Sequence, residues 1–315
     1  PKEGENPYAC ASDILKMWQD KGILKIEDKP AIYIYEEEFS VGNTRKSIKG
    51  IIARVQLEEF SKGIILPHEF TLSKAKEDRL NLMKATNCNF SQIYALYMDE
   101  KHTTLATIDE QSKAKADLEF TDETGVTHRL WIETDEEIIA KLVADFADRK
   151  LYIADGHHRY ETALNYRNYC RENGISKPGD PQDFQMIYLV DMEHPGLVVF
   201  PTHRLVRDLP NFDKEAVLEK CSEFFYIDEK EGTDTMEEDL KKLYDEGKKA
   251  FGFYCGKGEW FLLTLKNIDF MSQMLLDVSK ASQSLDVSVL HTLILEKIFG
   301  IDKENMAKQI NLTYT

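Results

Sequence analysis

Cysteine is scarce in this sequence and has no paired spacing. Five cysteines occur in 315 residues, and no two of them form a Cys-x-x-Cys motif. They are Cys10, Cys88, Cys170, Cys221 and Cys255. A disulfide framework or a zinc knuckle needs cysteines in closely spaced pairs. The pattern therefore argues against both and indicates reduced thiols in a cytoplasmic protein.

Long apolar runs are also absent. No stretch approaches the roughly 20 apolar residues that a helix needs to cross a bilayer. The chain opens with PKEGENPYACAS, which has neither the basic nor the apolar part of a secretory signal. We therefore expect no membrane association. Because the chain has no initiator Met and ends abruptly at LTYT, we expect it to be part of a longer gene product.

Positive charge is in the minority. The chain carries 40 Lys and Arg against 56 Asp and Glu, which gives a formal net charge of −16. A surface of this sign repels nucleic acid, so we expect no nucleic-acid partner. A site for a small anion would have to be a local positive pocket in a negative molecule.

Several motifs of catalysis and phosphate binding are missing. The sequence has no Gly-x-Ser-x-Gly nucleophile elbow, and no cysteine lies in its histidine-rich segments. Neither Gly-x-x-x-x-Gly-Lys-[Ser/Thr] nor Gly-x-Gly-x-x-Gly occurs. A Ser or Cys nucleophile is therefore not supported, and the two commonest phosphate-binding loops are absent.

The periodicity that is present predicts a mixed α/β fold. The length favours two domains, and we expect a core domain over 1–208 and a smaller α+β domain over 209–315. Alternating or short apolar runs predict strands over 30–39, 46–57, 92–98, 126–133, 151–154, 184–191, 197–200, 249–255 and 259–265. Helical spacing and capping residues predict helices over 9–22, 73–86, 135–148, 213–222, 234–246 and 287–299, and one after residue 157.

The most informative stretch is LYIADGHHRYETALNYRNY at 151–169. It predicts a buried strand, a tight Asp-Gly turn, and a helix that begins with the His-His-Arg cluster 157–159. The first N–H groups of a helix lack internal partners, and the helix dipole adds partial positive charge there. A guanidinium and two imidazoles reinforce that field. The stretch therefore predicts a site for a phosphate or a carboxylate.

Three other polar groups are candidates for the same site. They are His68 and Glu69 after Pro67, His128 and Arg129 on a strand, and Thr202, His203 and Arg204 after an apolar strand. A glutamate beside a histidine can serve as a general base, and open α/β sheets bind ligands where strands end. Each group also has a simpler explanation as loop or strand surface. Alternation along the strand would put His128 and Arg129 on opposite faces.

The histidines do not have the spacing of a structural metal site. No pair is arranged as His-x-His or His-x-x-x-His, and neighbouring histidines at a helix start diverge by about 100°. A magnesium ion bound through a phosphate and the Asp155 carboxylate fits better, because Mg²⁺ keeps its waters and needs few protein ligands.

Together the motifs IADGHHRYETA, HRLW, PTHRL, ILPHEFT and LDVSVLH resemble the domain-of-unknown-function 1015 family. Members of that family are described as relatives of the chromosome-partitioning protein ParB. The resemblance covers nearly the whole chain. The family usually has a further N-terminal segment and a C-terminal tail, which agrees with the expectation of a longer gene product.

The Asp-Gly-His-His-Arg core is also similar to the nucleotide-binding loop of the ParB/sulfiredoxin superfamily, and most similar to that of ParB-like free serine kinases. The resemblance implies phosphate contacts from His157, His158 and Arg159, with Gly156 allowing close backbone approach. It also implies a place for Asp155 near the metal or the substrate, and it makes Glu69 the base. Because His157 stands where sulfiredoxin has its cysteine, sulfinic acid reduction is not expected. The helix-turn-helix region of a DNA-partitioning ParB is missing.

These observations lead to one main hypothesis and two alternatives. The main hypothesis is a nucleotide-dependent phosphotransferase or nucleotide hydrolase that acts on a small molecule, with Mg²⁺ and ATP, ADP or CTP. Glu69, Asp155 and His157 would be catalytic, and Arg204 or Arg129 would neutralise charge during transfer. The first alternative is a nucleotide-binding switch of the ParB type without turnover. The second is an unrelated enzyme that uses the same pocket for a carboxylate. Oligomeric state stays open.

Overall fold

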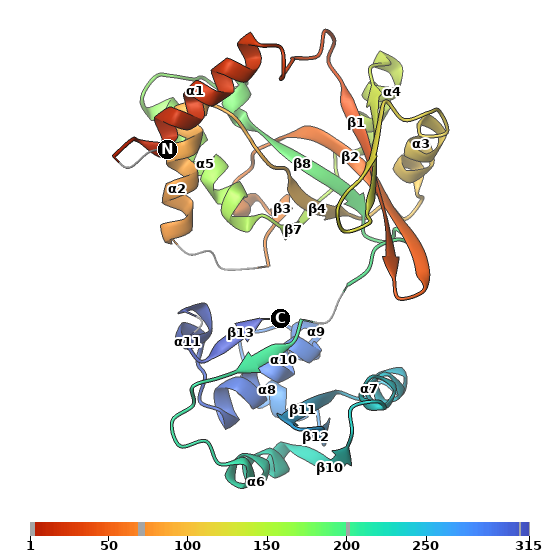
Figure 1. Cartoon of the computed structure of the whole chain (residues 1–315), viewed down its shortest axis with the longest axis vertical. Coiled ribbons are helices and arrows are strands. Elements are labelled where there is room, and N and C mark those ends of the chain that lie inside the picture. Colours follow the sequence, from red (N-terminus) through yellow and green to blue (C-terminus); the bar gives the residue numbers. More distant parts are fainter. Residues whose placement is uncertain (1–3, 69–72, 200–201, 309, 315) are drawn as a thin grey trace. The chain divides into compact units, whose positions relative to one another are not determined.

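The protein has a mixed α/β fold, as the periodicity predicts (Figure 1). The computed structural model describes residues 4–68, 73–199, 202–308 and 310–314. The chain divides into two compact units, Pro1–Val199 and Phe200–Thr315. The division thus falls a few residues before the expected boundary at 208. Each unit is described separately below.

The described residues of the first unit form one eight-stranded sheet in the order β3-β7-β4-β8-β2-β1-β6-β5. Its strands are β1 Ile32–Val41, β2 Thr44–Gln56, β3 Ile65–Leu66, β4 Ile93–Tyr97, β5 Leu118–Thr121, β6 Thr127–Glu133, β7 Leu151–Asp155 and β8 Phe184–Asp191. Its helices are α1 Pro7–Asp20, α2 Ser73–Thr86, α3 Thr103–Gln111, α4 Glu136–Asp145 and α5 His157–Glu172. The pairs β3–β7 and β4–β8 are parallel, and the other pairs are antiparallel.

Most of the elements expected in this unit are present. The predicted hairpin of residues 30–57 is the pair β1–β2, which turns at Gly42 with φ +57°. The predicted cap at Asp135 is confirmed, because its carboxylate accepts hydrogen bonds from the N–H groups of Glu137 and Ile138 at the start of α4. Three elements were not expected, α3, β3 and β5, and the strand expected at 197–200 is not formed by residues 197–199.

Strand alternation separates the sheet into two chemically different faces. One face carries the main core, in which Ile34, Ile51, Ile93 and Ile153 are almost fully buried. Helices α2, α3, α4 and α5 each add apolar side chains to this core. The other face carries a smaller cluster of tyrosines and aliphatic residues. The apolar face therefore fixes the fold, and the tyrosine face is left for other contacts.

Gly50 lets two central strands come close on the tyrosine face. It lies opposite Tyr35 in the β1–β2 register. A Cβ at residue 50 would stand 2.3 Å from the carbonyl oxygen of Leu189 and 2.8 Å from the Tyr188 ring. A backbone atom at that distance cannot move aside without disturbing the sheet. Glycine is therefore required here for packing.

The second unit is built on two small sheets, in the orders β10-β12-β11 and β13-β9. Its strands are β9 Arg204–Val206, β10 Phe225–Glu231, β11 Ala250–Gly256, β12 Glu259–Leu265 and β13 Leu312–Tyr314. Its helices are α6 Lys214–Phe224, α7 Met236–Asp245, α8 Asp269–Met274, α9 Lys280–Gln283, α10 Asp286–Val289 and α11 Lys303–Lys308, with a π-helix at Leu290–Ile298. The expected helix 287–299 is therefore a short α-helix continued by π-helix. Among the described helices of the whole chain, none has the length and apolarity to cross a bilayer.

We predict that Gly50→Ala destabilises the first unit by about 2–3 kcal/mol, because the new methyl group overlaps the Leu189 carbonyl. Urea unfolding followed by circular dichroism measures the effect. The matched control is Gly252→Ala in β11, where the nearest atom to a new Cβ is 3.5 Å away and little change is expected. Equal stability of Gly50→Ala and the parent would show that β2 and β8 are not packed as described.

Candidate functional site

The predicted strand–turn–helix is formed by β7, Gly156 and α5. Gly156 occupies the N-cap position of α5 with φ +96°, a conformation that L side chains rarely adopt. A Cβ here would also lie 2.9 Å from Nε of Arg159. The glycine therefore allows both the sharp turn into the helix and the close passage of the Arg159 side chain over it.

The start of α5 has the electrostatics of an anion site. Its first four residues are His-His-Arg-Tyr and include no acid that would compensate the helix dipole. The first turn is closed by the N–H of Tyr160, which donates to the carbonyl of Gly156 at 3.0 Å. The three preceding N–H groups have no carbonyl within the helix to bind. The helix dipole adds partial positive charge at this end, which favours an anionic ligand.

The Arg159 guanidinium joins the ends of two neighbouring strands. It donates to the carbonyl of Gln92 and to the Ser91 hydroxyl, both just before β4, and to the Asp155 carboxylate at the end of β7. These contacts use three of the five N–H groups that a guanidinium has. The side chain is about a quarter exposed, whereas that of Asp155 is 73% exposed. Arg159 is thus held in place while its side chain stays partly exposed.

The structure brings His68 and His157 together from distant parts of the sequence. Strand β3 pairs in parallel with β7, so the segments that follow the two strands leave the same edge of the sheet. The buried His157 accepts a hydrogen bond on Nε2 from the His68 N–H at 3.2 Å, and the two rings meet edge to face at 4.5 Å. This bond requires an unprotonated Nε2, so this nitrogen of His157 holds the segment in place. His158, in contrast, is only half-buried.

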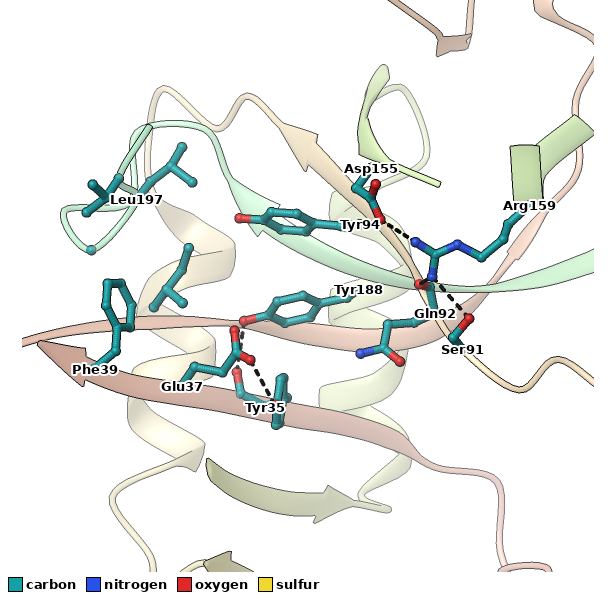
Figure 2. Close-up of a pocket in the computed structure, with 13 residues that line it drawn as sticks. Tyr35, Glu37, Phe39, Ser91, Gln92, Tyr94, Asp155, Arg159, Tyr188 and Leu197 are labelled. Atoms are coloured by element: carbon teal, nitrogen blue, oxygen red, sulfur yellow. Dashed lines mark hydrogen bonds and ion pairs between the residues drawn. The ribbon is translucent and has the colours of Figure 1, made fainter. Parts of the chain in front are cut away.

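A cavity of about 420 Å³ opens beside Arg159 on the tyrosine face of the sheet. Figure 2 shows Asp155 and Arg159 on one side of two stacked rings, Tyr94 and Tyr188, with Leu197 on the opposite side. The two ring centroids are 5.4 Å apart and the planes differ by 21°. The cavity therefore combines an aromatic wall with a fixed cation.

A chain of polar contacts reaches the cavity from β6. The Tyr35 hydroxyl, which lines the cavity, lies 2.7 Å from Nδ1 of His128 and donates to Glu37 at 3.1 Å. Nε2 of His128 lies 3.2 Å from the Asp122 carboxylate. The His128 ring is also stacked between Phe120 and Tyr35. His128 thus acts on the cavity through Tyr35 and does not line it.

Tyr35, Glu37, Tyr94 and Tyr188 were not among the candidates from the sequence. A signal for them exists in the strand pattern IYIYEEEF at 32–39, where alternation puts Tyr35 and Glu37 on one face and Glu36 and Glu38 on the other. Which face carries a cavity depends on strands far away in the sequence. Local periodicity therefore could not have selected these residues.

Arg129 lies on β6 and is not part of the site at the loop 155–159. As alternation predicts, it lies on the opposite face from His128, and its guanidinium binds three carboxylates. These are Glu36 at 3.1 Å, Glu38 at 2.9 Å and Glu119 at 2.6 Å. The same contacts raise the pKa of Arg129 and lower the pKa of Glu38. The expectation that Arg129 neutralises charge in phosphoryl transfer is corrected, because its charge is already balanced on the other side of the sheet.

Thr202, His203 and Arg204 belong to the second unit, where β9 begins at Arg204. The contacts of Arg204 are to groups of that unit: the Thr202 carbonyl, His291 and the Tyr314 ring. These residues therefore belong to a different unit from the loop at 155–159. Glu69, the expected base, lies outside the described residues, directly after His68 in the sequence.

The described residues contain no group of three or more His, Cys, Asp or Glu side chains arranged to hold a metal ion. Asp155 is the carboxylate next to Arg159, and Glu37 is the other carboxylate that lines the cavity. A divalent cation at this place would therefore have to take most of its ligands from a bound phosphate and from water.

The sequence matches the model of a family described as "Protein of unknown function (DUF1015)" over residues 1–288, so the chain belongs to that family. This confirms the resemblance to the domain-of-unknown-function 1015 family. No curated protein and no solved structure matches the chain.

Alkaline titration should reveal the buried tyrosines. Burial raises the pKa of Tyr94 and of Tyr160 from 10.0 to about 12. Burial also raises the pKa of Tyr35 and Tyr188 above the ordinary value, with Glu37 adding to the effect. Because the pKa of these tyrosines is raised in the folded state, their contribution to the free energy of unfolding is complete below pH 10. It is lost as the pH rises through 12, because the unfolded chain releases these protons earlier.

We therefore predict that part of the tyrosinate absorbance appears only above pH 10, in a step that coincides with loss of circular dichroism. Tyr94→Phe should reduce the amplitude of this late step. Titration of all tyrosines in a single transition centred at pH 10, with the fold intact, would contradict the described burial.

Proposed function

We propose that this member of the DUF1015 family is a nucleotide-dependent phosphotransferase or nucleotide hydrolase that acts on a small molecule. The observation that carries the proposal is that one cavity is lined by Arg159 and Asp155, at the start of α5, and by an aromatic wall. The cationic Arg159 suits a phosphate, and the aromatic wall suits a nucleobase. Both are expected in a site for a nucleotide.

The start of α5 and the Arg159 side chain suit the phosphate end of a nucleotide. The Arg159 guanidinium, His158 and the positive end of the α5 dipole can attract phosphate oxygens. Gly156 has no side chain that would keep a phosphate away from the backbone. Because the guanidinium is fixed by Gln92 and Asp155, little side-chain entropy is lost when a ligand binds.

The base would lie against the tyrosines. Stacking of a nucleobase on an aromatic ring typically contributes about 1–3 kcal/mol and tolerates any base. The open position beside Tyr94 and Tyr188 supports binding of a base but does not favour ATP over CTP. Tyr35 and Glu37 provide a hydroxyl and a carboxylate at the same wall, and these can distinguish exocyclic amino from carbonyl groups.

Magnesium would enter with the phosphates. Asp155 is well exposed and can give a cation one carboxylate oxygen while its other oxygen stays with Arg159. The bound ion would neutralise phosphate charge as the phosphoryl group is transferred. Glu69 remains the proposed base towards an acceptor hydroxyl, because it follows His68 directly and His68 is bonded to His157 on the loop.

We predict that Arg159→Ala weakens the binding of ATP, ADP, CTP or pyrophosphate by about tenfold to a hundredfold, the loss expected for charge-assisted hydrogen bonds. Isothermal titration calorimetry with and without Mg²⁺ measures the effect. The matched control is Arg171→Ala on the same helix, which removes an ion pair with Asp183 about 18 Å along the axis and should leave affinity unchanged. If folded Arg159→Ala binds every nucleotide like the parent, the phosphate assignment is wrong.

Turnover separates an enzyme from a switch. We predict release of ADP or AMP from ATP and Mg²⁺ that is stimulated by free amino acids such as serine, and that is abolished in Glu69→Gln. Glu77→Gln, on the exposed surface of α2, is the control and should keep full activity. Turnover that is unchanged in Glu69→Gln would contradict the role of Glu69 as the base. Nucleotide binding that alters the mass in light scattering, with no turnover, would favour the ParB-type switch.

A further inference from the structure

The second unit contains a larger cavity that the proposed nucleotide site does not use. Its volume is about 810 Å³, within the range typical of pockets for small organic ligands. One wall is the stretch 203–209, and the facing walls come from β11, α7 and the π-helix. Most of the lining side chains are apolar, among them Phe212, Met236, Phe251, Phe253, Leu290 and Ile294.

The polar end of this cavity is Arg204. Its guanidinium donates to the Thr202 carbonyl, lies 3.3 Å from Nε2 of His291 and sits 5.2 Å from the Tyr314 ring centroid. Its Nε is fully buried and has no hydrogen-bond partner among the described residues. Burial lowers the pKa of Arg204 and, together with the Arg204 charge, the pKa of His291. The histidine therefore accepts from the arginine and does not neutralise it.

A buried cationic N–H without an acceptor is costly, because the group has lost water and gained no bond. The other arginine of the cavity, Arg207, is half exposed and lies 4.0 Å from the Asp208 carboxylate. Among the described residues, the charge of Arg204 is therefore left without a carboxylate partner. An anionic ligand with a single charge matches this arrangement.

The wall that carries His291 has an unusual backbone. Residues Leu290–Ile298 form a π-helix, whose end is marked by the hydrogen bond from the Phe299 N–H to the Ile294 carbonyl at 3.0 Å. π-Helical turns are rare, usually short, and frequent at functional sites. Leu290, Ile294 and Leu295 of this helix line the cavity.

We propose that this cavity binds a small carboxylate with a hydrocarbon body. The carboxylate pairs with the Arg204 guanidinium, which lines the cavity. The hydrocarbon part lies against the phenylalanine side chains of β11 and the aliphatic side chains of the π-helix. All the residues that line this cavity belong to the second unit.

Alkylation of Cys255 tests the proposal. This half-buried thiol lines the cavity, so an occupying ligand shields it from iodoacetamide. Decanoate is the probe, decanol and decyltrimethylammonium are its neutral and cationic analogues, and mass spectrometry of the full chain gives the rate at each cysteine. We expect decanoate to slow alkylation of Cys255 in a saturable manner while the rate at Cys88 of the first unit does not change.

Arg204→Gln should raise the decanoate concentration needed for half protection by about tenfold, the loss of one charge-assisted hydrogen bond. Lys220→Gln, an exposed change of the same charge on α6, should leave it unchanged. Decanol should protect at least about tenfold less well than decanoate. Equal protection by decanol, or unchanged protection in Arg204→Gln, overturns the role of Arg204. If no probe protects Cys255, the cavity is not a site for such ligands.

Discussion

The first unit depends on the parallel pairing of β3 with β7. Parallel strands end at the same edge of a sheet, and here the two ends are followed by Pro-His-Glu and by Asp-Gly-His-His-Arg. The hydrogen bond from the His68 N–H to His157 joins the two segments. His157 is buried for this purpose, whereas Arg159 and the helix start remain accessible. The same short pairing thus contributes Ile65 and Leu151 to the core and brings the two histidine segments together.

Charge in this unit is balanced locally, although the chain as a whole is strongly acidic. Arg129 is surrounded by three glutamates, and the Arg149 guanidinium lies 2.9 Å from Asp99. Arg159 differs because Asp155, its carboxylate partner among the residues that the structure describes, is largely exposed. Part of its field therefore extends into the cavity. A phosphate that enters there would meet a cation already fixed in position, which is the physical basis of the proposed nucleotide site.

The two units use arginine in different ways. In the first unit Arg159 lies at the rim of a polar, aromatic cavity that suits a phosphorylated ligand. In the second unit Arg204 lies at the end of a mostly apolar cavity, with one buried donor unused among the described residues. The similar motifs His-His-Arg and Thr-His-Arg therefore have different chemical surroundings. Motif content alone would have assigned them to one site.

The sequence by itself determined the local elements and the glycine turn with its basic cluster at 155–159. The hairpin 30–57, the Asp135 cap and the β7–Gly156–α5 turn follow from alternation, capping and glycine conformation, which act over a few residues. Only the tertiary structure decided which of these elements are neighbours. In the tertiary structure His68 contacts His157, and Arg129 lies among glutamates on the other face of the sheet. Arg204 belongs to the second unit. Tyr35, Tyr94 and Tyr188 pack together as one aromatic wall. Strand order and sheet faces depend on the packing of residues far apart in the chain, and no local pattern encodes that packing.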